Sequence, residues 1–119
     1  MKVDKPCNGG QWSVARKRSF IMSALRGASR RWSPAYQCKK NARVSRNAYR
    51  CAHCGKIFGS KEIKIDHIIP VVDPSGMDNS WDAIIDRMFP EVEGYQMLCV
   101  ADHDIKTAEE NAKRKLNKK

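Results

Sequence analysis

The sequence predicts an α+β protein in which a basic helical extension precedes a smaller module of short strands and helices. Three observations lead to this expectation. In the first third of the chain, apolar residues recur with the period of a helix. Near the middle, residues 63–67 alternate between apolar and polar types, as in a half-buried strand. Between these two regions lies a C-x-x-C motif, formed by Cys51 and Cys54.

The extension, residues 1–47, is expected to contain two helices. Ser13 is a plausible N-cap for a helix that ends near Arg31. Its apolar positions, Ile21, Leu25, Ala28 and Trp32, fall at i, i+4, i+7 and i+11. Its other faces carry Arg16, Lys17, Arg18, Arg26, Arg30 and Arg31. Ser33-Pro34 ends this helix. A second short helix is expected over 34–41, followed by a basic connector over 43–47.

The module, residues 48–119, reads as short strands separated by a long insertion and ending in a helix. Strands are expected near 49–51, 57–58 and 63–67. Ser80 can cap a helix that presents an apolar stripe and ends at Pro90. A further strand is expected over 95–98, and a helix over 102–116.

The positive charge is concentrated in the first half of the chain. The net charge of +10 divides into +13 for residues 1–56 and −3 for residues 57–119. A basic arm joined to an acidic module is typical of a nucleic-acid binder whose acidic part also holds metal. A merely soluble basic protein is the alternative that the charge alone leaves open.

The length and composition favour an intracellular, cytoplasmic protein. No apolar run approaches the ~20 residues of a membrane span, and the first ten residues lack a signal-peptide core. A chain of 119 residues has room for one domain with an extension. Five cysteines, two of them in C-x-x-C, favour metal binding over disulfides in a reducing compartment.

The cysteines indicate a structural zinc site. Cys51 and Cys54 have the spacing of a zinc knuckle, and Cys99 begins a second half-site. Three residues after Cys99 the chain has Asp102, which can complete a Cys3Asp site. Alternatively, Asp102 caps the last helix, and the fourth ligand is His53 or water. A third interpretation treats the cysteines only as small buried residues.

The remaining histidines indicate a catalytic site for phosphodiester hydrolysis. Asp66 offers an oxygen and His103 a nitrogen to one divalent cation, leaving coordination positions for water and phosphate. His67 stays free to remove a proton from water, since an imidazole titrates near neutral pH. On a strand, His67 and Asp66 point to opposite sides, so both border one cleft only if the strand end twists. A packed or surface histidine is the alternative.

These residues resemble the HNH endonuclease family, and most of all the small free-standing HNH proteins of bacteriophages. The matching segments are Cys51–Cys54, Ile65–Pro70 and Leu98–Thr107, with His103 and Lys106 in the last. The resemblance implies a ββα-metal nuclease core, with His67 as general base and Asp66 and His103 binding a catalytic Mg, Mn, Ni or Zn ion. It implies cleavage of DNA to 5′-phosphate and 3′-hydroxyl ends, in the host-cell cytoplasm if the protein is phage-encoded.

The chain departs from the family pattern at two positions. Gly94 stands where the family usually has an asparagine that braces the loop carrying the base, and Asn79 is a candidate substitute. Asp102 stands in place of a zinc cysteine. Both leave open a degenerate HNH scaffold that binds zinc and DNA without cleaving, or a structural adaptor in phage replication or packaging.

Double-stranded DNA is the expected partner. The six basic residues of the first helix can lie along its phosphates, which would make binding depend steeply on salt. Trp12, Trp32 and Tyr36 stack on bases or, alternatively, pack within the protein. Whether the protein is a monomer or a homodimer, and whether it nicks or cuts both strands, stays open.

Overall fold

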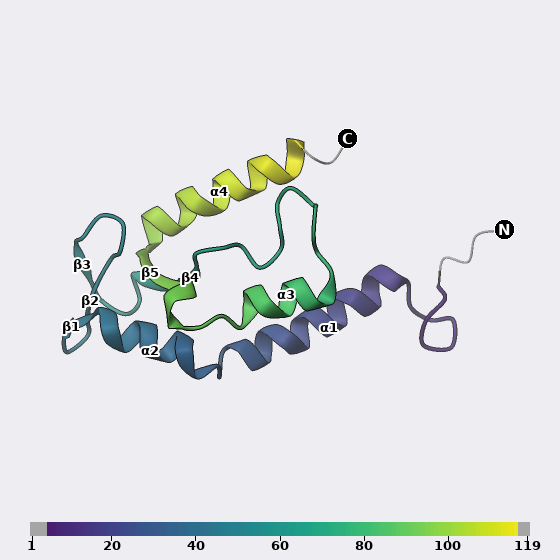
Figure 1. The fold of residues 1–119 in the computed structure, drawn as a ribbon, viewed down its shortest axis with the longest axis horizontal. Coiled ribbons are helices and arrows are strands. Elements are labelled where there is room, and N and C mark those ends of the chain that lie inside the picture. The colour runs from purple at the N-terminus through teal and green to yellow at the C-terminus, as the bar shows by residue number, and fades with distance from the viewer. Residues whose placement is uncertain (1–4, 117–119) are drawn as a thin grey trace. The chain divides into compact units, whose positions relative to one another are not determined.

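The computed structural model describes residues 5–116; positions 1–4 and 117–119, at the ends of the two expected domains, lie outside it. The described chain folds into α-helices, short strands and one 3₁₀ turn (Figure 1): α1 (Val14–Ser29), α2 (Ser33–Ala42), β1 (Arg43–Ser45), β2 (Ala48–Arg50), β3 (Ile57–Phe58), β4 (Ile63–His67), α3 (Trp81–Met88), η1 (Val92–Gly94), β5 (Tyr95–Cys99) and α4 (Val100–Leu116). The expected α+β class is confirmed for this part of the chain.

The chain divides into two compact units, Met1–Arg31 and Trp32–Lys119. The second unit therefore includes α2 and β1, which the sequence analysis assigned to an extension ending at residue 47. We call the two parts the arm unit and the core unit.

The arm unit consists of a turn and helix α1. Residues Cys7 and Trp12 form an isolated antiparallel bridge that closes the turn. Ser13 caps the helix as expected, since its Oγ accepts a hydrogen bond from the Arg16 backbone N–H at 3.1 Å. The Trp12 ring lies 5.2 Å from that of Phe20 and 4.7 Å from the Arg16 guanidinium. The Trp12 side chain therefore packs against α1 within the arm unit.

The core unit contains two small antiparallel sheets. One has the strand order β1-β2-β3, and the other pairs β4 with β5 from Ile63↔Cys99 to His67↔Tyr95. The segment 43–47, predicted as a basic connector, forms β1 and a tight turn. The turn places Asn47 at a φ of 52°, a conformation that asparagine tolerates better than most residues.

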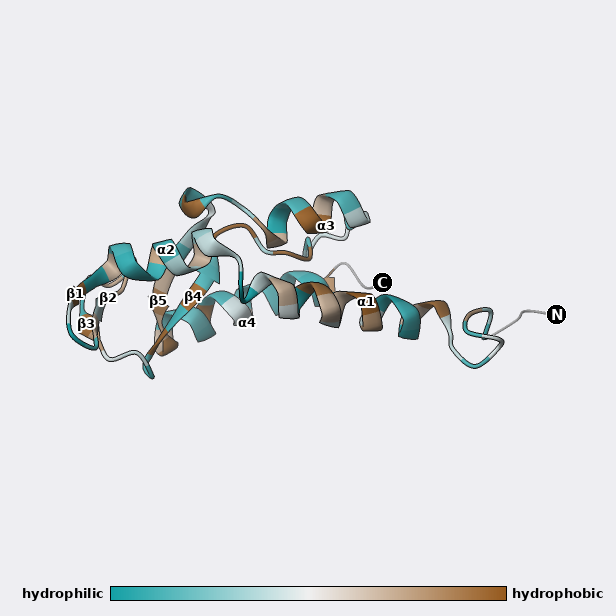
Figure 2. Cartoon of the chain, turned by 90° about the horizontal axis from the view of Figure 1, so that it is seen from below, coloured by the Kyte–Doolittle hydropathy of each residue, from teal (hydrophilic) through white to brown (hydrophobic). Residues whose placement is uncertain are grey.

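The hydrophobic core lies between α2 and strand β5. Met97, Leu98 and Cys99 are buried on β5, and Cys38 is buried on α2. Strand β5 is largely brown in Figure 2, as its burial requires. Trp32 donates a hydrogen bond from Nε1 to the Pro90 carbonyl at 2.7 Å, so this ring serves packing within the core unit.

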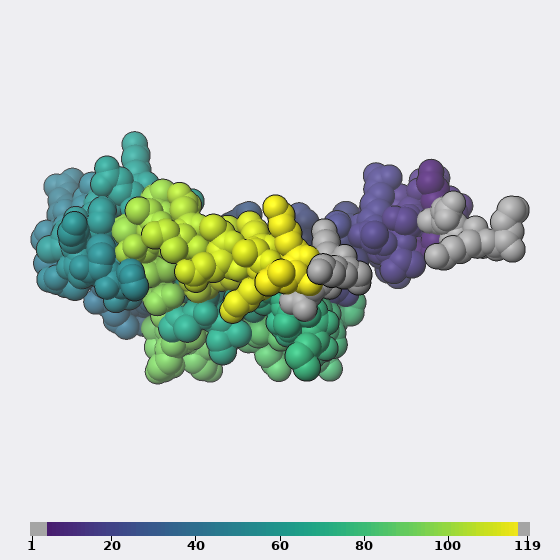
Figure 3. Space-filling view, turned by 90° about the horizontal axis from the view of Figure 1, so that it is seen from above, coloured from purple at the N-terminus to yellow at the C-terminus, as the bar shows by residue number. Residues whose placement is uncertain are grey.

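Helix α4 packs against β4 and β5, which completes a strand–strand–helix arrangement. It lies along one face of the core unit in Figure 3, where it is green to yellow. The helix begins at Val100, two residues before the expected start. Within residues 5–116, no helix has the length and apolar character that crossing a membrane requires.

Helix α3 closes the long insertion between β4 and β5. Ser80 caps it as expected, and Ile84 and Met88 are its buried residues. Asn79 accepts a hydrogen bond from the Asp73 backbone N–H at 2.7 Å and another from the Arg87 side chain at 3.1 Å. Asn79 therefore braces the loop before α3. Helix α3 ends at Met88, whose carbonyl lies beside the His67 ring.

Candidate metal cluster and catalytic site

Three cysteines and one aspartate converge where β2, β5 and α4 meet. Cys51, Cys54, Cys99 and Asp102 each offer one ligand atom, and these atoms all lie within 4.8 Å of one another. In a tetrahedral zinc site, neighbouring ligand atoms are about 3.3–3.8 Å apart. This group, the metal cluster, could therefore hold one metal ion, as the sequence predicted for these four residues.

The backbone brings the cluster together across three elements. The knuckle turn follows β2, and Gly55 closes it at a φ of +75°, a conformation that a side chain would strain. The Ala52 backbone N–H donates to the Met97 carbonyl at 2.8 Å, which ties the knuckle to β5. Cys99 ends β5, and Asp102 lies in the first turn of α4.

The side chain of Asp102 faces the sulfurs. Its Oδ2 lies 3.3 Å from Cys51 Sγ and 3.3 Å from Cys99 Sγ. Because α4 begins at Val100, Asp102 is its third residue and not the N-cap that the alternative required. His53 is exposed and does not belong to the cluster.

The electrostatics of the metal cluster are those of crowded anions. Burial would raise the pKa of Cys51, but backbone N–H groups of Cys54, Cys99 and His53 outweigh it, and the pKa is lowered. The Asp102 backbone N–H lowers the pKa of Cys99. Burial, the Asp102 carboxylate and the Cys51 sulfur together act more strongly and raise that pKa to about 11. Thiol hydrogen bonds from Cys99 and Cys51 lower the pKa of Asp102. A bound cation would relieve this crowding.

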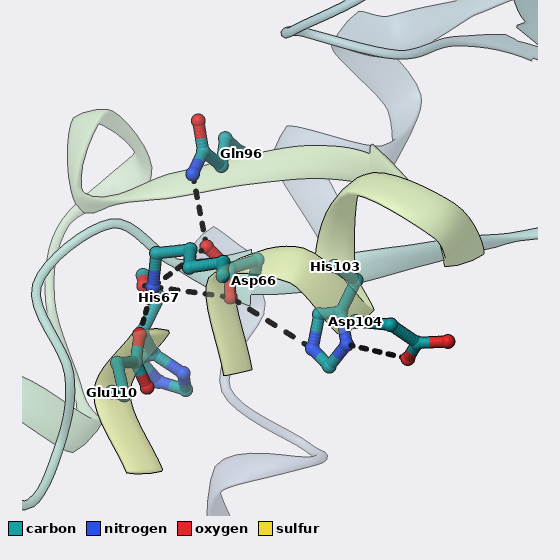
Figure 4. A network of polar contacts seen from close by, with 7 residues as sticks. Asp66, His67, Gln96, His103, Asp104 and Glu110 are labelled. Atoms are coloured by element: carbon teal, nitrogen blue, oxygen red, sulfur yellow. Dashed lines mark hydrogen bonds and ion pairs between the residues drawn. The ribbon is translucent and has the colours of Figure 1, made fainter. Parts of the chain in front are cut away.

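A second convergence links β4 with α4. Asp66 is 8 % exposed, and its Oδ1 lies 3.8 Å from Nε2 of His103 (Figure 4). Two ligands about 2.0–2.2 Å from one ion lie at most about 4.4 Å apart, so both atoms are within reach of the same cation. We call this the carboxylate–imidazole pair.

The second ring nitrogen of His103 lacks a bonded partner. Its Nδ1 is buried without a hydrogen bond, and Asp104 Oδ1 lies 4.0 Å from it. If Nε2 binds a cation, Nδ1 carries the proton and needs an acceptor, as metal-bound histidines usually have. The distance from Nε2 to Asp66 Oδ1, and not the environment of Nδ1, is therefore what fits coordination by His103.

Lys106 places a cation beside the same carboxylate. Its Nζ lies 3.3 Å from Asp66 Oδ2 and 2.7 Å from Glu110 Oε2, and it donates to the His67 backbone carbonyl at 2.9 Å. Burial would lower the pKa of Lys106, but Glu110 and Asp66 outweigh burial and raise it. Gln96 donates to Asp66 Oδ2 at 2.9 Å and fixes the carboxylate from β5.

His67 is held from the opposite side of β4. Its Nε2 lies 3.0 Å from the Met88 carbonyl, and because a carbonyl only accepts, this nitrogen donates. In the neutral ring the lone pair is then on Nδ1. The ring also contacts Tyr95 at 4.8 Å, whose hydroxyl donates to the same carbonyl at 3.3 Å. Asp66 and His67 thus keep the strand alternation, and their side chains bond to different partners.

The close approach of Pro90 explains why position 94 is a glycine. A Cβ atom there would lie 2.6 Å from Pro90 Cβ, so no asparagine fits without a shift. The Gly94 carbonyl accepts from the Ile68 backbone N–H at 3.0 Å, directly after His67. Backbone contacts from Gly94 and Met88 therefore hold the segment carrying His67, and Asn79 braces a different loop.

The structure brings together both predicted ligand sets but adds residues that the sequence analysis did not assign. Gln96, the Met88 carbonyl and the Lys106–Glu110 pair hold the site. The register of β4 with β5 places Gln96 opposite Asp66, a pairing that two separate strand predictions do not supply. The six predicted DNA-binding residues belong to the arm unit; four lie in α1, and Arg30 and Arg31 directly follow it.

Comparison of the chain with protein-family models, curated proteins and solved structures found no match.

Proposed function

We propose that the protein is a metal-dependent endonuclease of the HNH type that hydrolyses phosphodiester bonds in double-stranded DNA. One observation carries this proposal. A carboxylate on β4 and an imidazole on α4 converge to 3.8 Å, and the next residue on β4 is a second, oriented imidazole. Two ligands alone leave a cation open to water and to phosphate oxygens, as catalysis requires.

The chain supplies the groups that hydrolysis needs. His67 takes a proton from water at Nδ1 while the water oxygen attacks phosphorus. The bond from phosphorus to the 3′ oxygen breaks, leaving a 5′-phosphate. The 3′ oxygen takes a proton from solvent, and His67 later returns its own. A divalent cation held by Asp66 and His103 would supply positive charge to the phosphate oxygens. General-base help contributes about 100- to 10,000-fold.

In this proposal the metal cluster holds a structural zinc. Three sulfurs and one carboxylate suit zinc in charge and in the spacing of the ligand atoms. The ion would fasten β2, β5 and α4 together at the end of the small core. It would take no part in the reaction, because Cys51 and Cys99 are buried away from a substrate.

The basic residues of α1 and of the two positions after it are proposed to contact DNA phosphates. They supply most of the positive charge of the arm unit: Arg16, Lys17, Arg18, Arg26, Arg30 and Arg31. Arg16 stacks on Trp12, and Arg31 donates to the Gly27 carbonyl at 3.2 Å, so part of this charge is held in place along the helix. Such contacts give affinity but little sequence preference.

A supercoiled-plasmid assay tests the proposal. Zinc-loaded protein is incubated with Mg²⁺, Mn²⁺, Ni²⁺ or added Zn²⁺, and nicked and linear products are separated. Wild-type protein is expected to cut with at least one ion. Asp66→Ala and His103→Ala are expected to lose at least 100-fold in rate, whereas Asp86→Ala, an exposed aspartate on α3, should cut normally.

A non-catalytic, metal-bearing DNA-binding protein is the second candidate, and Lys106 favours it. Its ammonium already neutralises Asp66 at 3.3 Å, which reduces the attraction for a cation. If wild-type protein binds DNA but cuts with none of the four ions, this second function replaces the first. A stoichiometric protein partner without DNA affinity at low salt would instead indicate a structural adaptor.

A further inference from the structure

A hollow on α2 and the first sheet gathers positive charge. It has a volume of about 480 Å³ and is lined by Tyr36, Lys39, Lys40, Arg43, Asn47 and Tyr49. Within residues 5–116, none of its three cations forms an ion pair with a carboxylate. The surrounding segment, 32–61, contains seven Lys and Arg and no Asp or Glu. Three neighbouring cations without a counter-ion repel one another, so this basic pocket suits an anionic ligand.

The cations of the basic pocket are held by aromatic rings. Lys40 Nζ lies 4.7 Å from the centre of the Tyr36 ring, and Lys39 Nζ lies 5.4 Å from that of Tyr49. Arg43 donates from Nε to the Ser45 carbonyl at 3.3 Å. These contacts reduce the freedom that the side chains would lose on binding. Tyr36 is 61 % exposed and offers a surface to a sugar or base.

Two further hollows share lining residues with the basic pocket or with each other. Arg43 also lines a cavity of about 650 Å³ that extends along the knuckle turn. That cavity shares Ala52 and His53 with a third hollow of about 370 Å³. The third hollow is lined by Gln96 and Lys106, and both of these side chains bond to Asp66. The core unit therefore carries a series of neighbouring hollows, with the three cations in the first and two partners of Asp66 in the last.

We infer that the basic pocket anchors backbone phosphates of the nucleic-acid strand whose scissile bond lies at Asp66. The ligand is recognised by its phosphodiester charge, and Tyr36 packs against an adjacent sugar or base. The inference rests on the proposed function in taking DNA as the ligand. It assigns a second phosphate contact, distinct from α1, to the same compact unit that carries the ligands and the base.

The test compares two double variants that change the net charge equally. Lys39→Gln with Lys40→Gln alters the basic pocket, whereas Lys61→Gln with Lys115→Gln alters exposed lysines that line none of the three hollows. All proteins carry Asp66→Ala, so that binding is measured without cleavage. Affinity for duplex DNA is followed by fluorescence anisotropy between 50 and 200 mM salt, conditions over which phosphate contacts dominate the change.

The pocket variant is expected to lower the slope of log affinity against log salt by about two, or about one per lost phosphate contact. The control double variant should keep the slope of the parent protein that carries only Asp66→Ala. Tyr36→Ala should weaken binding roughly tenfold with the slope unchanged, because it removes stacking and not charge. Lys40→Gln alone, at an exposed position, should lower the slope by about one if the double variant does not fold.

Equal slopes for the two double variants would overturn the inference, since the charge would then act without a defined contact. The nuclease proposal fails separately. A wild-type protein that never cuts, but whose pocket variant loses salt dependence, would reject cleavage and keep the pocket. If the wild-type protein cuts plasmid but the pocket variant binds DNA with unchanged salt dependence, cleavage is kept and the phosphate-binding role of the pocket is rejected.

Discussion

The metal cluster and the carboxylate–imidazole pair both take a ligand from the first turns of α4, but they balance charge differently. In the metal cluster, three sulfurs and Asp102 converge, and within residues 5–116 no lysine or arginine forms an ion pair with that carboxylate. In the pair, Lys106 already lies 3.3 Å from Asp66. Within the described residues, the metal cluster therefore has no lysine or arginine to balance Asp102, whereas Lys106 already balances Asp66.

The two sites also differ in what they connect. The metal cluster joins β2, β5 and α4, and Cys51 at its centre is fully buried. The pair joins β4 and α4, which the β4–β5 ladder and Lys106 already hold. Losing the cation of the metal cluster should therefore cost stability, while losing the cation of the pair should cost only activity.

The largest effect is expected from Cys51→Ser. The variant should lose its structural metal and the cooperative unfolding of the core unit, because a structural zinc contributes about 10–16 kcal/mol, as much as the whole stability of a small domain. Native mass spectrometry and thermal unfolding measure both. Cys38→Ala, a buried cysteine outside the metal cluster, should keep one metal ion and unfold cooperatively at a lower temperature. A Cys51→Ser protein that melts like the wild type would contradict the comparison.

A crossed pair of aspartate variants separates stability from chemistry. Asp66→Asn should lower plasmid cleavage by at least 100-fold and leave zinc content unchanged, because it weakens only the catalytic cation. Asp102→Asn should weaken zinc binding about 10- to 100-fold, and cleavage should return when zinc is added in excess. Chelator titration and the plasmid assay give the two readouts. Equal loss of zinc in both variants would show that the sites are not independent.

Several candidate ligand residues could be identified from the sequence because they occupy a local pattern. Cys51 and Cys54 are recognised by the C-x-x-C spacing of a single turn. Asp66 and His67 are recognised because they end a segment of alternating apolar and polar residues that predicts one strand. Asp102 was harder, since the same residue type caps helices and binds metal. Its role depends on whether α4 begins at residue 100 or 102, and helix ends are poorly fixed by sequence.

What sequence could not supply are contacts across elements. The Met88 carbonyl holds His67 from 21 positions away, at the end of a helix that the sequence predicted only as a core-packing helix. Lys106 belonged to a recognised motif, but its bond to the His67 carbonyl depends on how α4 packs on β4. Gly94 departs from the pattern of the family that the sequence resembles, and the close approach of Pro90 that accounts for it is not visible in the sequence.

Lys106→Met tests whether the ammonium competes with the catalytic cation. Removing it leaves Asp66 and Glu110 without their shared partner, so Mn²⁺ should bind about fivefold more tightly, since a partly exposed ion pair is worth about 1 kcal/mol. Calorimetric titration of zinc-loaded protein measures the affinity. Lys115→Met, exposed on the same helix, should leave it unchanged. Equal Mn²⁺ affinity in both variants would mean that Lys106 does not oppose the ion.

The metal cluster should also show a dependence on pH that reverses when metal binds. In the metal-free protein the pKa of Cys99 is raised from 9.0 to about 11, so the folded state holds this proton more tightly than the unfolded chain. Its contribution to stability is present below pH 9.0 and is lost as the pH rises through about 11.

Zinc must displace the Cys99 proton, so affinity for zinc should rise about tenfold per pH unit below that pKa. Competition with a chelating dye between about pH 6 and pH 8 measures the slope, because free cysteine is still protonated there. The Cys51 pKa is lowered, so Cys51 adds less to this slope near neutral pH. A zinc affinity that does not change with pH would mean that the sulfurs are already ionised, and that the metal cluster is not the crowded, cation-deficient group that distinguishes it from Asp66 and His103.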